Sequence, residues 1–164
     1  MTLTLNPYLS FRGQARAALE RYAEIFGGTL SLMPFGDLPG SAGPEDASLI
    51  MHGQVDGIAG GLTLMAADVP TGTEVTVGDD LAIALTGDDE ETLRRWWEGL
   101  IEGGIVEVPL AMAPWGDWFG QVTDRFGGRW MVSIATPVDT ATPVDSGEAA
   151  AGGAAAERSA ADDG

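Results

Sequence analysis

Apolar residues along this chain follow two periods in turn, first that of a strand and then that of a helix. Leu3 to Phe11 alternates in part between apolar and polar residues, which predicts a strand. After Gly13, apolar residues spaced three and four apart predict an amphipathic helix, and Gly27-Gly28 ends it. Strands are then predicted at residues 29–35, 48–55 and 61–66, with a flexible Gly- and Pro-rich loop at 36–44.

The second half of the chain gives the same order of elements. A strand is predicted at residues 81–86, and the carboxylates of Asp88 to Glu91 then stand where a helix start favours anions. Gly103-Gly104 ends that helix, and three more strands are predicted at 105–108, 118–123 and 130–134. Three successive strands joined by short turns are antiparallel, so each half has the order βαβββ.

The two halves also match residue by residue. Gly13, Leu19 and Tyr22 are followed 74 positions later by Gly87, Leu93 and Trp96. The block Gly53-Gln54-Val55 returns 67 positions later as Gly120-Gln121-Val122. A period near 70 is longer than solenoid repeats, which run to roughly 50 residues, so it indicates a duplicated half-domain. We therefore predict one domain over residues 1–137, made of repeats at about 1–67 and 78–137.

Residues 138–164 differ from the rest in composition, being rich in Ala, Gly, Asp and Pro and without aromatic residues. Such a segment buries too little apolar surface to offset its ordering entropy. We predict an acidic, disordered tail. Cutting the chain after residue 137 is expected to leave the melting temperature unchanged.

Charge and cysteine content exclude several classes of function. The chain has eight Arg, no Lys and a formal charge of −17, which disfavours nucleic acids and anionic membranes. It has no cysteine, so disulfides, thiolate metal sites and cysteine nucleophiles are excluded. No apolar run approaches the 18 residues of a membrane span, and the expected setting is the cytoplasm.

Five segments resemble the PhnB-like branch of the vicinal oxygen chelate superfamily, which includes glyoxalase I, bleomycin-resistance proteins and extradiol dioxygenases. The matching segments cover most of the chain and are Asn6–Phe11, Tyr22–Gly28, Met51-His52, Pro114–Gly120 and Asp124–Gly127 with Trp130. The resemblance implies an α+β fold in which two βαβββ modules form a cup-shaped, mostly antiparallel sheet of eight strands with two main helices. It also implies a homodimer.

Metal-using members of that superfamily hold a divalent ion in the cup with His, Glu or Gln ligands from both modules. The fourth-strand ligand is expected four residues after Gly127, at Met131, and the offset of 67 carries it to Leu64. The ligand that begins the second module's first strand is expected near Leu81. All three residues are apolar, so we expect no cofactor. If a metal is bound, the single histidine, His52, is the best candidate ligand, with Asp79, Asp80 or Asp117 beside it.

The candidate ligand-binding residues of the cup or its mouth are Tyr8, His52, Trp115, Asp117 and Trp118. Aromatic rings at a cavity mouth suit flat or cationic ligands. A structural role remains open for each tryptophan, and His52 could simply bond a neighbour on its strand.

Two functions follow from these residues. The first is binding of a small organic ligand, aromatic or cationic, in the cup without a catalytic metal. The alternative is a divalent-metal-dependent enzyme of the glyoxalase or dioxygenase type, with a non-standard ligand set that includes His52. A dimer without any ligand is a third reading. PhnB-like proteins are often labelled as methyltransferases, but the sequence has no glycine-rich strand–turn–helix for a methyl donor.

Overall fold

A computed structural model describes residues 3–38, 40, 43–78 and 80–136. The tail predicted at 138–164 and the candidate ligand Asp79 lie outside the described residues. Within the described part, no helix is both long and apolar enough to cross a membrane.

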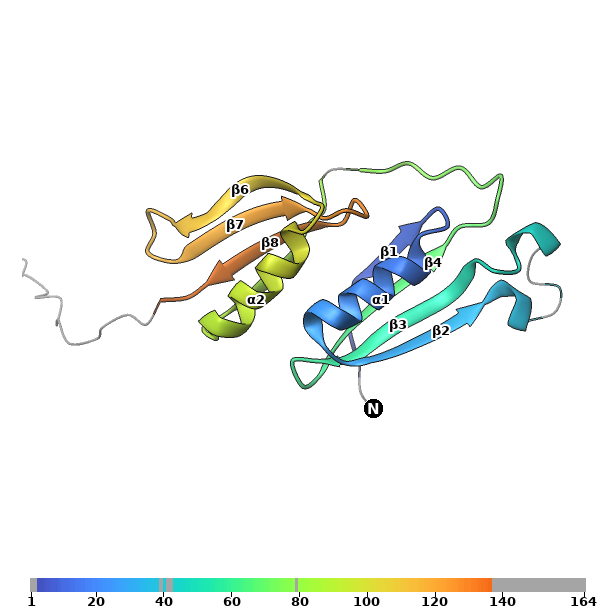
Figure 1. Cartoon of the computed structure of the whole chain (residues 1–164), viewed down its shortest axis with the longest axis horizontal. Helices are drawn as coiled ribbons and strands as arrows, with labels where there is room; N and C mark the ends of the chain where they lie inside the picture. The colour runs from blue at the N-terminus through green and yellow to red at the C-terminus, as the bar shows by residue number, and fades with distance from the viewer. Residues whose placement is uncertain (1–2, 39, 41–42, 79, 137–164) are drawn as a thin grey trace, which may run out of the picture.

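The chain folds into two βαβββ modules that lie side by side along its long axis (Figure 1). This confirms the α+β fold and the duplicated half-domain expected from the repeat. The first module consists of β1 (Tyr8–Phe11), α1 (Ala15–Phe26), β2 (Thr29–Pro34), β3 (Ile50–Ile58) and β4 (Leu62–Asp68). The second consists of β5 (Ile83–Gly87), α2 (Glu90–Ile101), β6 (Ile105–Met112), β7 (Trp118–Thr123) and β8 (Arg129–Ile134).

The eight strands divide equally between two sheets, in the orders β1-β4-β3-β2 and β5-β8-β7-β6. In each sheet the last three strands of the module are antiparallel, as predicted, and the first strand pairs in parallel with the fourth. The parallel pair requires a crossover, and the helix of each module provides it. The same topology occurs twice, so positions can be matched between modules by their register.

Both helices begin and end where the sequence predicted. Gly27 terminates α1 with φ +74°, a backbone conformation that favours glycine. Asp89 caps α2 by accepting a hydrogen bond from the Thr92 amide at 3.0 Å, and this bond lowers the pKa of the Asp89 carboxyl.

Three strands differ most clearly from the prediction. The first begins at Tyr8, because Leu3 and Leu5 are exposed and only residues 8–11 pair with β4. β3 continues to Ile58, three residues past its predicted end. β6 continues through Pro109 to Met112, which its place at the edge of the sheet allows.

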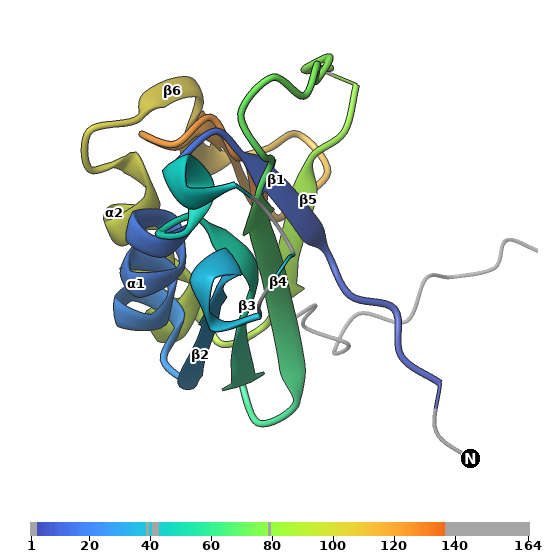
Figure 2. The same ribbon diagram turned by 90° about the vertical axis from the view of Figure 1, so that its right-hand side faces the viewer.

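The helices lie on the same side of the two sheets (Figure 2). In each sheet, one glycine on a central strand lets the helix of that module approach the sheet closely. A Cβ added at Gly53 would lie 2.4 Å from Leu19 Cδ1 on α1, and one at Gly120 would lie 2.9 Å from Trp97 Cη2 on α2. The repeated Gly-Gln-Val block therefore places a glycine under each helix.

The two modules share one apolar core, and a buried carboxylate joins them. Asp124, in the turn between β7 and β8, accepts hydrogen bonds from Tyr22 Oη of α1 and from Trp130 Nε1, both at 2.7 Å. It also accepts from the amides of Phe126 and Gly128, as aspartate commonly does in turns. Burial, followed by the Asp124 charge, raises the pKa of the Tyr22 phenol well above its usual range.

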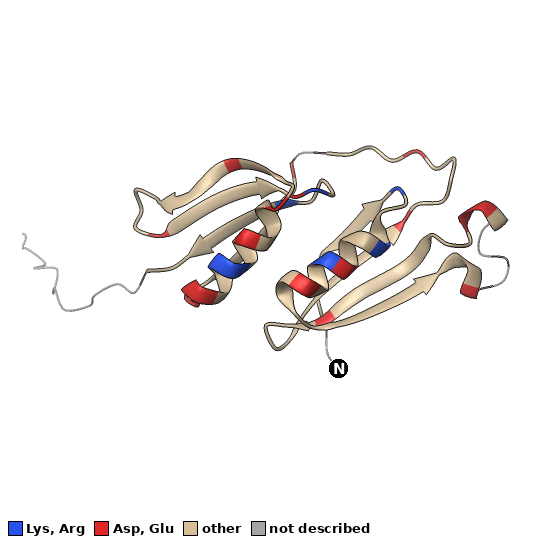
Figure 3. Ribbon diagram, in the orientation of Figure 1, with Lys and Arg blue, Asp and Glu red and all other residues tan. Residues whose placement is uncertain are grey.

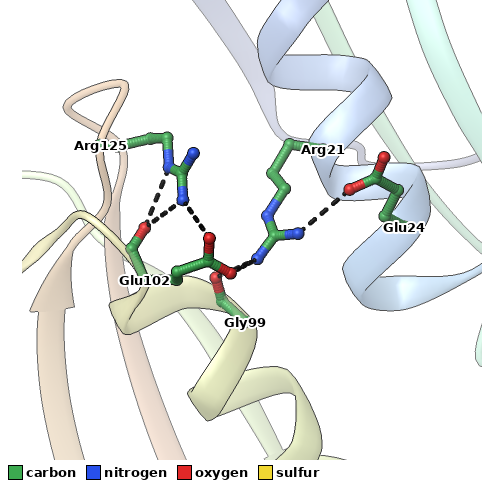
Figure 4. A network of polar contacts seen from close by, with 5 residues as sticks. All are labelled: Arg21, Glu24, Gly99, Glu102 and Arg125. Atoms are coloured by element: carbon green, nitrogen blue, oxygen red, sulfur yellow. Dashed lines mark hydrogen bonds and ion pairs between the residues drawn. The ribbon is translucent and has the colours of Figure 1, made fainter.

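A second link between the modules lies nearer the surface (Figure 4). Glu102, at the end of α2, forms ion pairs with Arg21 of α1 at 2.5 Å and with Arg125 of the β7–β8 turn at 3.0 Å. Arg21 also donates to the Gly99 carbonyl at 3.3 Å. The Arg125 hydrogen bond and the two positive charges lower the pKa of Glu102. Exposed ion pairs contribute little stability, so this network mainly fixes how the helices sit against each other.

Candidate functional site

Each sheet has one face covered by its helix and one open face. In β3 and β4 the residues that face the helix are buried, whereas those between them are half-buried on the open side. Charged residues are concentrated on the helices and loops, and the strands are largely uncharged (Figure 3). Charged side chains on the open sheet faces are therefore few among the described residues.

Five polar side chains form a continuous hydrogen-bonded row on the open face of the first sheet. Tyr8 Oη lies 3.3 Å from His52 Nδ1, and His52 Nε2 lies 3.3 Å from Gln54 Oε1. Gln54 Nε2 donates to Asp56 Oδ2 at 2.5 Å, and Thr63 Oγ1 donates to Asp56 Oδ1 at 2.8 Å. We call Tyr8, His52, Gln54, Asp56 and Thr63 the polar row. It starts on β1, reaches across β4 to β3, follows β3 and returns to β4 at Thr63.

The register between strands shows which residues occupy the same places in the second module. Gln54 pairs with Met65 and Gln121 with Met131, while Asp56 pairs with Thr63 and Thr123 with Arg129. Tyr8 pairs with Met65, and Ala84 pairs with Met131. The places of the polar row are therefore filled, in order, by Ala84, Phe119, Gln121, Thr123 and Arg129.

An ion pair closes one end of the second open face. Glu107 of β6 accepts from Thr123 Oγ1 at 2.6 Å and pairs with Arg129 Nη2 at 3.1 Å. The hydrogen bond from Thr123 and then that from Arg129 lower the pKa of Glu107. Only the glutamine is common to the two faces.

This register corrects two of the equivalences inferred from the sequence. The counterpart of Met131 is Met65 and not Leu64, which faces the helix and is only 4% exposed. The cause is a register shift between Asp56 and Ile58 that has no equivalent in the pairing of β7 with β8, so the first hairpin is one residue longer. The residue beside Met131 is Ala84, whereas Leu81 precedes β5 and is exposed.

The chain is similar to proteins of one superfamily in both sequence and structure. Residues 4–132 match the family described as Glyoxalase/Bleomycin resistance protein/Dioxygenase superfamily. Protein YjdN of Escherichia coli (strain K12) is 31% identical over 145 residues, which cover 80% of this chain and 95% of that protein. The chain belongs to the glyoxalase/bleomycin resistance protein/dioxygenase superfamily.

Solved structures agree with this assignment. Protein PA1353 from Pseudomonas aeruginosa is 36% identical with a TM-score of 0.72, over 81% of this chain and 98% of that chain. A Bacillus cereus protein described as a putative 3-demethylubiquinone-9 3-methyltransferase, PhnB protein, is 21% identical with a TM-score of 0.63, over 81% of this chain and all of that chain. At that identity the likeness concerns the fold alone. The resemblance to the superfamily inferred from the sequence is confirmed by the family match, and the fold agrees with that of a PhnB protein.

Members of this superfamily commonly use a divalent metal, and the residues here do not fit one. The places at which ligands would be expected carry Tyr8, Met65, Ala84 and Met131, which supply neither imidazole nor carboxylate. Across residues 3–136, except for the undescribed positions 39, 41, 42 and 79, no group of three or more His, Asp or Glu side chains could hold a metal ion. We derive no metal-dependent step for this chain.

The structure brings two of the five predicted site residues together, namely Tyr8 and His52. Their rings lie 5.9 Å apart with a tilt of 33°, and Tyr8 is about half exposed. The other three, Trp115, Asp117 and Trp118, belong to the turn between β6 and β7 and to the start of β7. They do not take part in the polar row.

Those three residues have different surroundings. Trp115 is 63% exposed, and its ring meets that of Phe119 edge-on at 5.5 Å. Asp117 Oδ1 accepts from the Thr136 amide at 3.3 Å, which ties this turn to the end of the second sheet. Trp118 lies on the helix side of its sheet, where the Arg94 guanidinium stands 4.1 Å from its ring centroid. Of the three, Trp115 is the one whose ring is available at the surface.

A cavity of about 350 Å³ lies between the modules. Its walls are mainly apolar and include Leu5, Phe26, Leu62, Leu64, Leu85 and Trp130. Neither Tyr8 nor His52 borders it. The cavity offers volume, whereas the polar row offers hydrogen-bonding groups.

Three members of the polar row were not predicted as site residues, namely Gln54, Asp56 and Thr63. The signal was present, because His52, Gln54 and Asp56 are polar residues at every second position of one strand and so share a face. The predicted strand ended at Val55, so Asp56 was left outside it. Thr63 joins the row only through the pairing of β3 with β4.

Proposed function

We propose that this protein binds a small organic ligand, aromatic or cationic, on the open face of its first sheet, without a catalytic metal. The observation that carries the proposal is the polar row, whose five side chains are connected by hydrogen bonds on a face that no helix of the described chain covers. Binding sites combine apolar surface with a few polar groups, and Met33 and Met65 flank this row in register.

Charge supports a cationic or hydrogen-bond-donating ligand. Strands β1 to β4 contain no arginine, and the chain has no lysine. Asp56 is therefore the only side chain on this row with a full charge at pH 7 when His52 is neutral. The formal charge of −17 adds a field that attracts cations and repels anions.

We further propose that the protein works as a homodimer, in which a second copy covers exposed apolar residues of the second module. α1 packs on β2, β3 and β4, whereas α2 packs on β5, β7 and β8. The edge strand β6 exposes apolar side chains on both of its faces, namely Ile105 (70%), Val106 (42%), Val108 (37%) and Met112 (50%). An apolar strand edge of this kind commonly marks an interface.

Dimerisation is tested by analytical ultracentrifugation of the full chain and of the Val106→Glu variant. A dimer that the variant converts to monomer is the expected result. A monomeric wild type at concentrations near 100 μM would contradict the proposal.

Ligand binding is tested by thermal shift with a panel of aromatic ammonium compounds, alongside elemental analysis of protein purified without chelator. The expected result is stabilisation by members of the panel, reduced in His52→Ala and retained in Asp37→Asn, a variant of an exposed carboxylate outside the row. Stoichiometric Ni, Zn, Mn or Fe that disappears in His52→Ala would contradict the proposal and favour the metal-dependent enzyme.

A further inference from the structure

The polar row ends on a group that can only accept hydrogen bonds. An ionised carboxylate has no hydrogen to donate, so both groups that meet Asp56 must donate to it. These are Gln54 Nε2 at 2.5 Å and Thr63 Oγ1 at 2.8 Å. If the Gln54 amide were reversed, its oxygen would face a carboxylate oxygen at the same short distance. Asp56 therefore fixes the orientation of the Gln54 amide.

That orientation decides the tautomer of His52. With its nitrogen toward Asp56, Gln54 presents Oε1 to His52 Nε2 at 3.3 Å. An oxygen can only accept there, so the hydrogen of the neutral imidazole is on Nε2. Nδ1 is then an acceptor, and Tyr8 Oη, 3.3 Å away, must donate to it. Every hydrogen in the row points toward Asp56.

We propose that Asp56 is a positioning residue that sets the direction of this hydrogen-bonded row, so that Tyr8 presents its oxygen to a ligand as an acceptor. The inference rests on the proposed function of the same face. Because the Tyr8 hydrogen is used on His52, the group recognised at the exposed end is a donor. The tilted rings of Tyr8 and His52 lie at this end, and Met33 flanks His52 in register, so the ligand class is an arylalkylamine in its ammonium form.

The second module has the same strand arrangement but no carboxylate at the place of Asp56. Thr123 stands at the place of Asp56, and a hydroxyl can donate or accept, so it sets no direction. In this structure the Thr123 hydroxyl donates away from the row, to Glu107. Phe119 and Ala84 stand at the places of His52 and Tyr8.

His52 is the only histidine in the chain, so its ring nitrogens can be observed without assignment by ¹⁵N NMR. At pH 8.5, above the ordinary titration range of imidazole, we expect the wild type to be almost wholly the Nε2–H tautomer. The Asp56→Lys variant replaces the acceptor with a donor. Gln54 must then turn, its nitrogen donates to His52 Nε2, and the hydrogen moves to Nδ1. The control variant Asp37→Lys makes the same change of charge at an exposed site and should keep the Nε2–H tautomer.

The probes are phenethylammonium and phenylacetate, which share a ring and differ in the sign and hydrogen bonding of the attached group. We expect the wild type and Asp37→Lys to bind phenethylammonium at least tenfold more tightly than phenylacetate, and Asp56→Lys to lose that preference. A folded Asp56→Lys that keeps the Nε2–H tautomer would overturn the inference, as would a wild type that prefers phenylacetate. If neither probe binds the wild type, both the ligand class and the proposed function are contradicted. The tautomer measurement tests the positioning role of Asp56 separately.

Discussion

The two modules have the same backbone plan and different open faces. Both place a Gly-Gln-Val block under the helix, and both pair the glutamine with a methionine on the neighbouring strand. On the first face the glutamine connects His52 to Asp56. On the second, its neighbours along the strand are Phe119 and Thr123. The two modules thus share the Gly-Gln-Val block and the paired methionine, and differ at the other places of the polar row.

The buried sides of the modules also differ. The turn between β7 and β8 carries Asp124, which is buried and accepts four hydrogen bonds. At the corresponding point, the first hairpin has the register shift beside Gly57, whose φ is +76°. Asp56 and Asp124 therefore have different roles. Asp56 serves an open face, whereas Asp124 holds the core together.

The largest expected effect comes from removing the carboxylate of the core. Asp124→Ala leaves the Tyr22 hydroxyl, the Trp130 indole N–H and two backbone amides without their acceptor, so we expect a loss of roughly 3 to 5 kcal/mol in the free energy of unfolding. Asp56→Asn, on the open face, should cost less than about 1 kcal/mol. Urea unfolding of both variants measures the difference. Equal losses would remove the distinction between the two carboxylates.

The glycines under the helices offer a smaller and more direct comparison. The added methyl group of Gly120→Ala would meet the rigid Trp97 ring at 2.9 Å and the Leu110 backbone at 3.0 Å, so we expect a loss of about 1–3 kcal/mol. In Gly53→Ala the nearest atoms are the terminal methyl groups of Leu19 at 2.4 Å and Leu32 at 2.9 Å, which can turn aside. The second variant should therefore lose less. A larger loss in Gly53→Ala, measured by thermal unfolding, would show that the first module is packed more rigidly.

The hydrogen bond between Tyr22 and Asp124, which joins the modules, should make the free energy of unfolding fall at alkaline pH. The folded protein raises the pKa of Tyr22, whereas the unfolded chain titrates it near 10. Stability from the protonated phenol is complete below pH 10 and falls as the pH rises above it, by about 1.4 kcal/mol per pH unit. The chain has no lysine to titrate in this range, and its other tyrosine, Tyr8, is half exposed.

Chemical unfolding between pH 9 and 11.5 checks this slope. Tyr22→Phe is the matched control and should lack most of it. A wild type whose stability is flat across this range would mean that Tyr22 ionises without cost in the folded protein.

The smallest effect on stability, and the largest effect on ligand binding, is expected when a residue of the polar row is replaced by its counterpart in the second module. His52→Phe copies Phe119 into the first module and should change the free energy of unfolding by about 0.5 kcal/mol or less. Binding of phenethylammonium, followed by NMR titration, should weaken at least tenfold. The converse variant, Phe119→His, should gain no binding, since the position four residues further along its strand is Thr123 and carries no carboxylate.

Much of the fold was predictable because its signals are local. Both helices were predicted from the spacing of apolar residues, the acidic start of the second helix and the glycines at the helix ends. The strands were predicted to within a few positions from the turn residues between them. The duplication gave the topology. These features depend on residues close together in the sequence, for which patterns are informative.

The site was less predictable because it depends on register. The fixed offset of 67 failed at Leu64, since one extra residue in the first hairpin moves every later side chain to the opposite face. Trp118 shares the parity of Gly120, which packs on the helix, so its direction could have been inferred from the sequence. The contact of Tyr22 with Asp124 spans 102 residues and no local pattern encodes it.

The register shift beside Gly57 also decides how hybrids of the two halves must be aligned. Residues of β8 placed on β4 at the fixed offset of 67 would turn their inward side chains outward. Aligned on the equivalent pairs Asp56–Thr63 and Thr123–Arg129, the shorter second turn can replace the longer first turn without moving either strand. The extra residue is therefore confined to the turn, and strand pairing is the correct guide for exchanging segments between the copies.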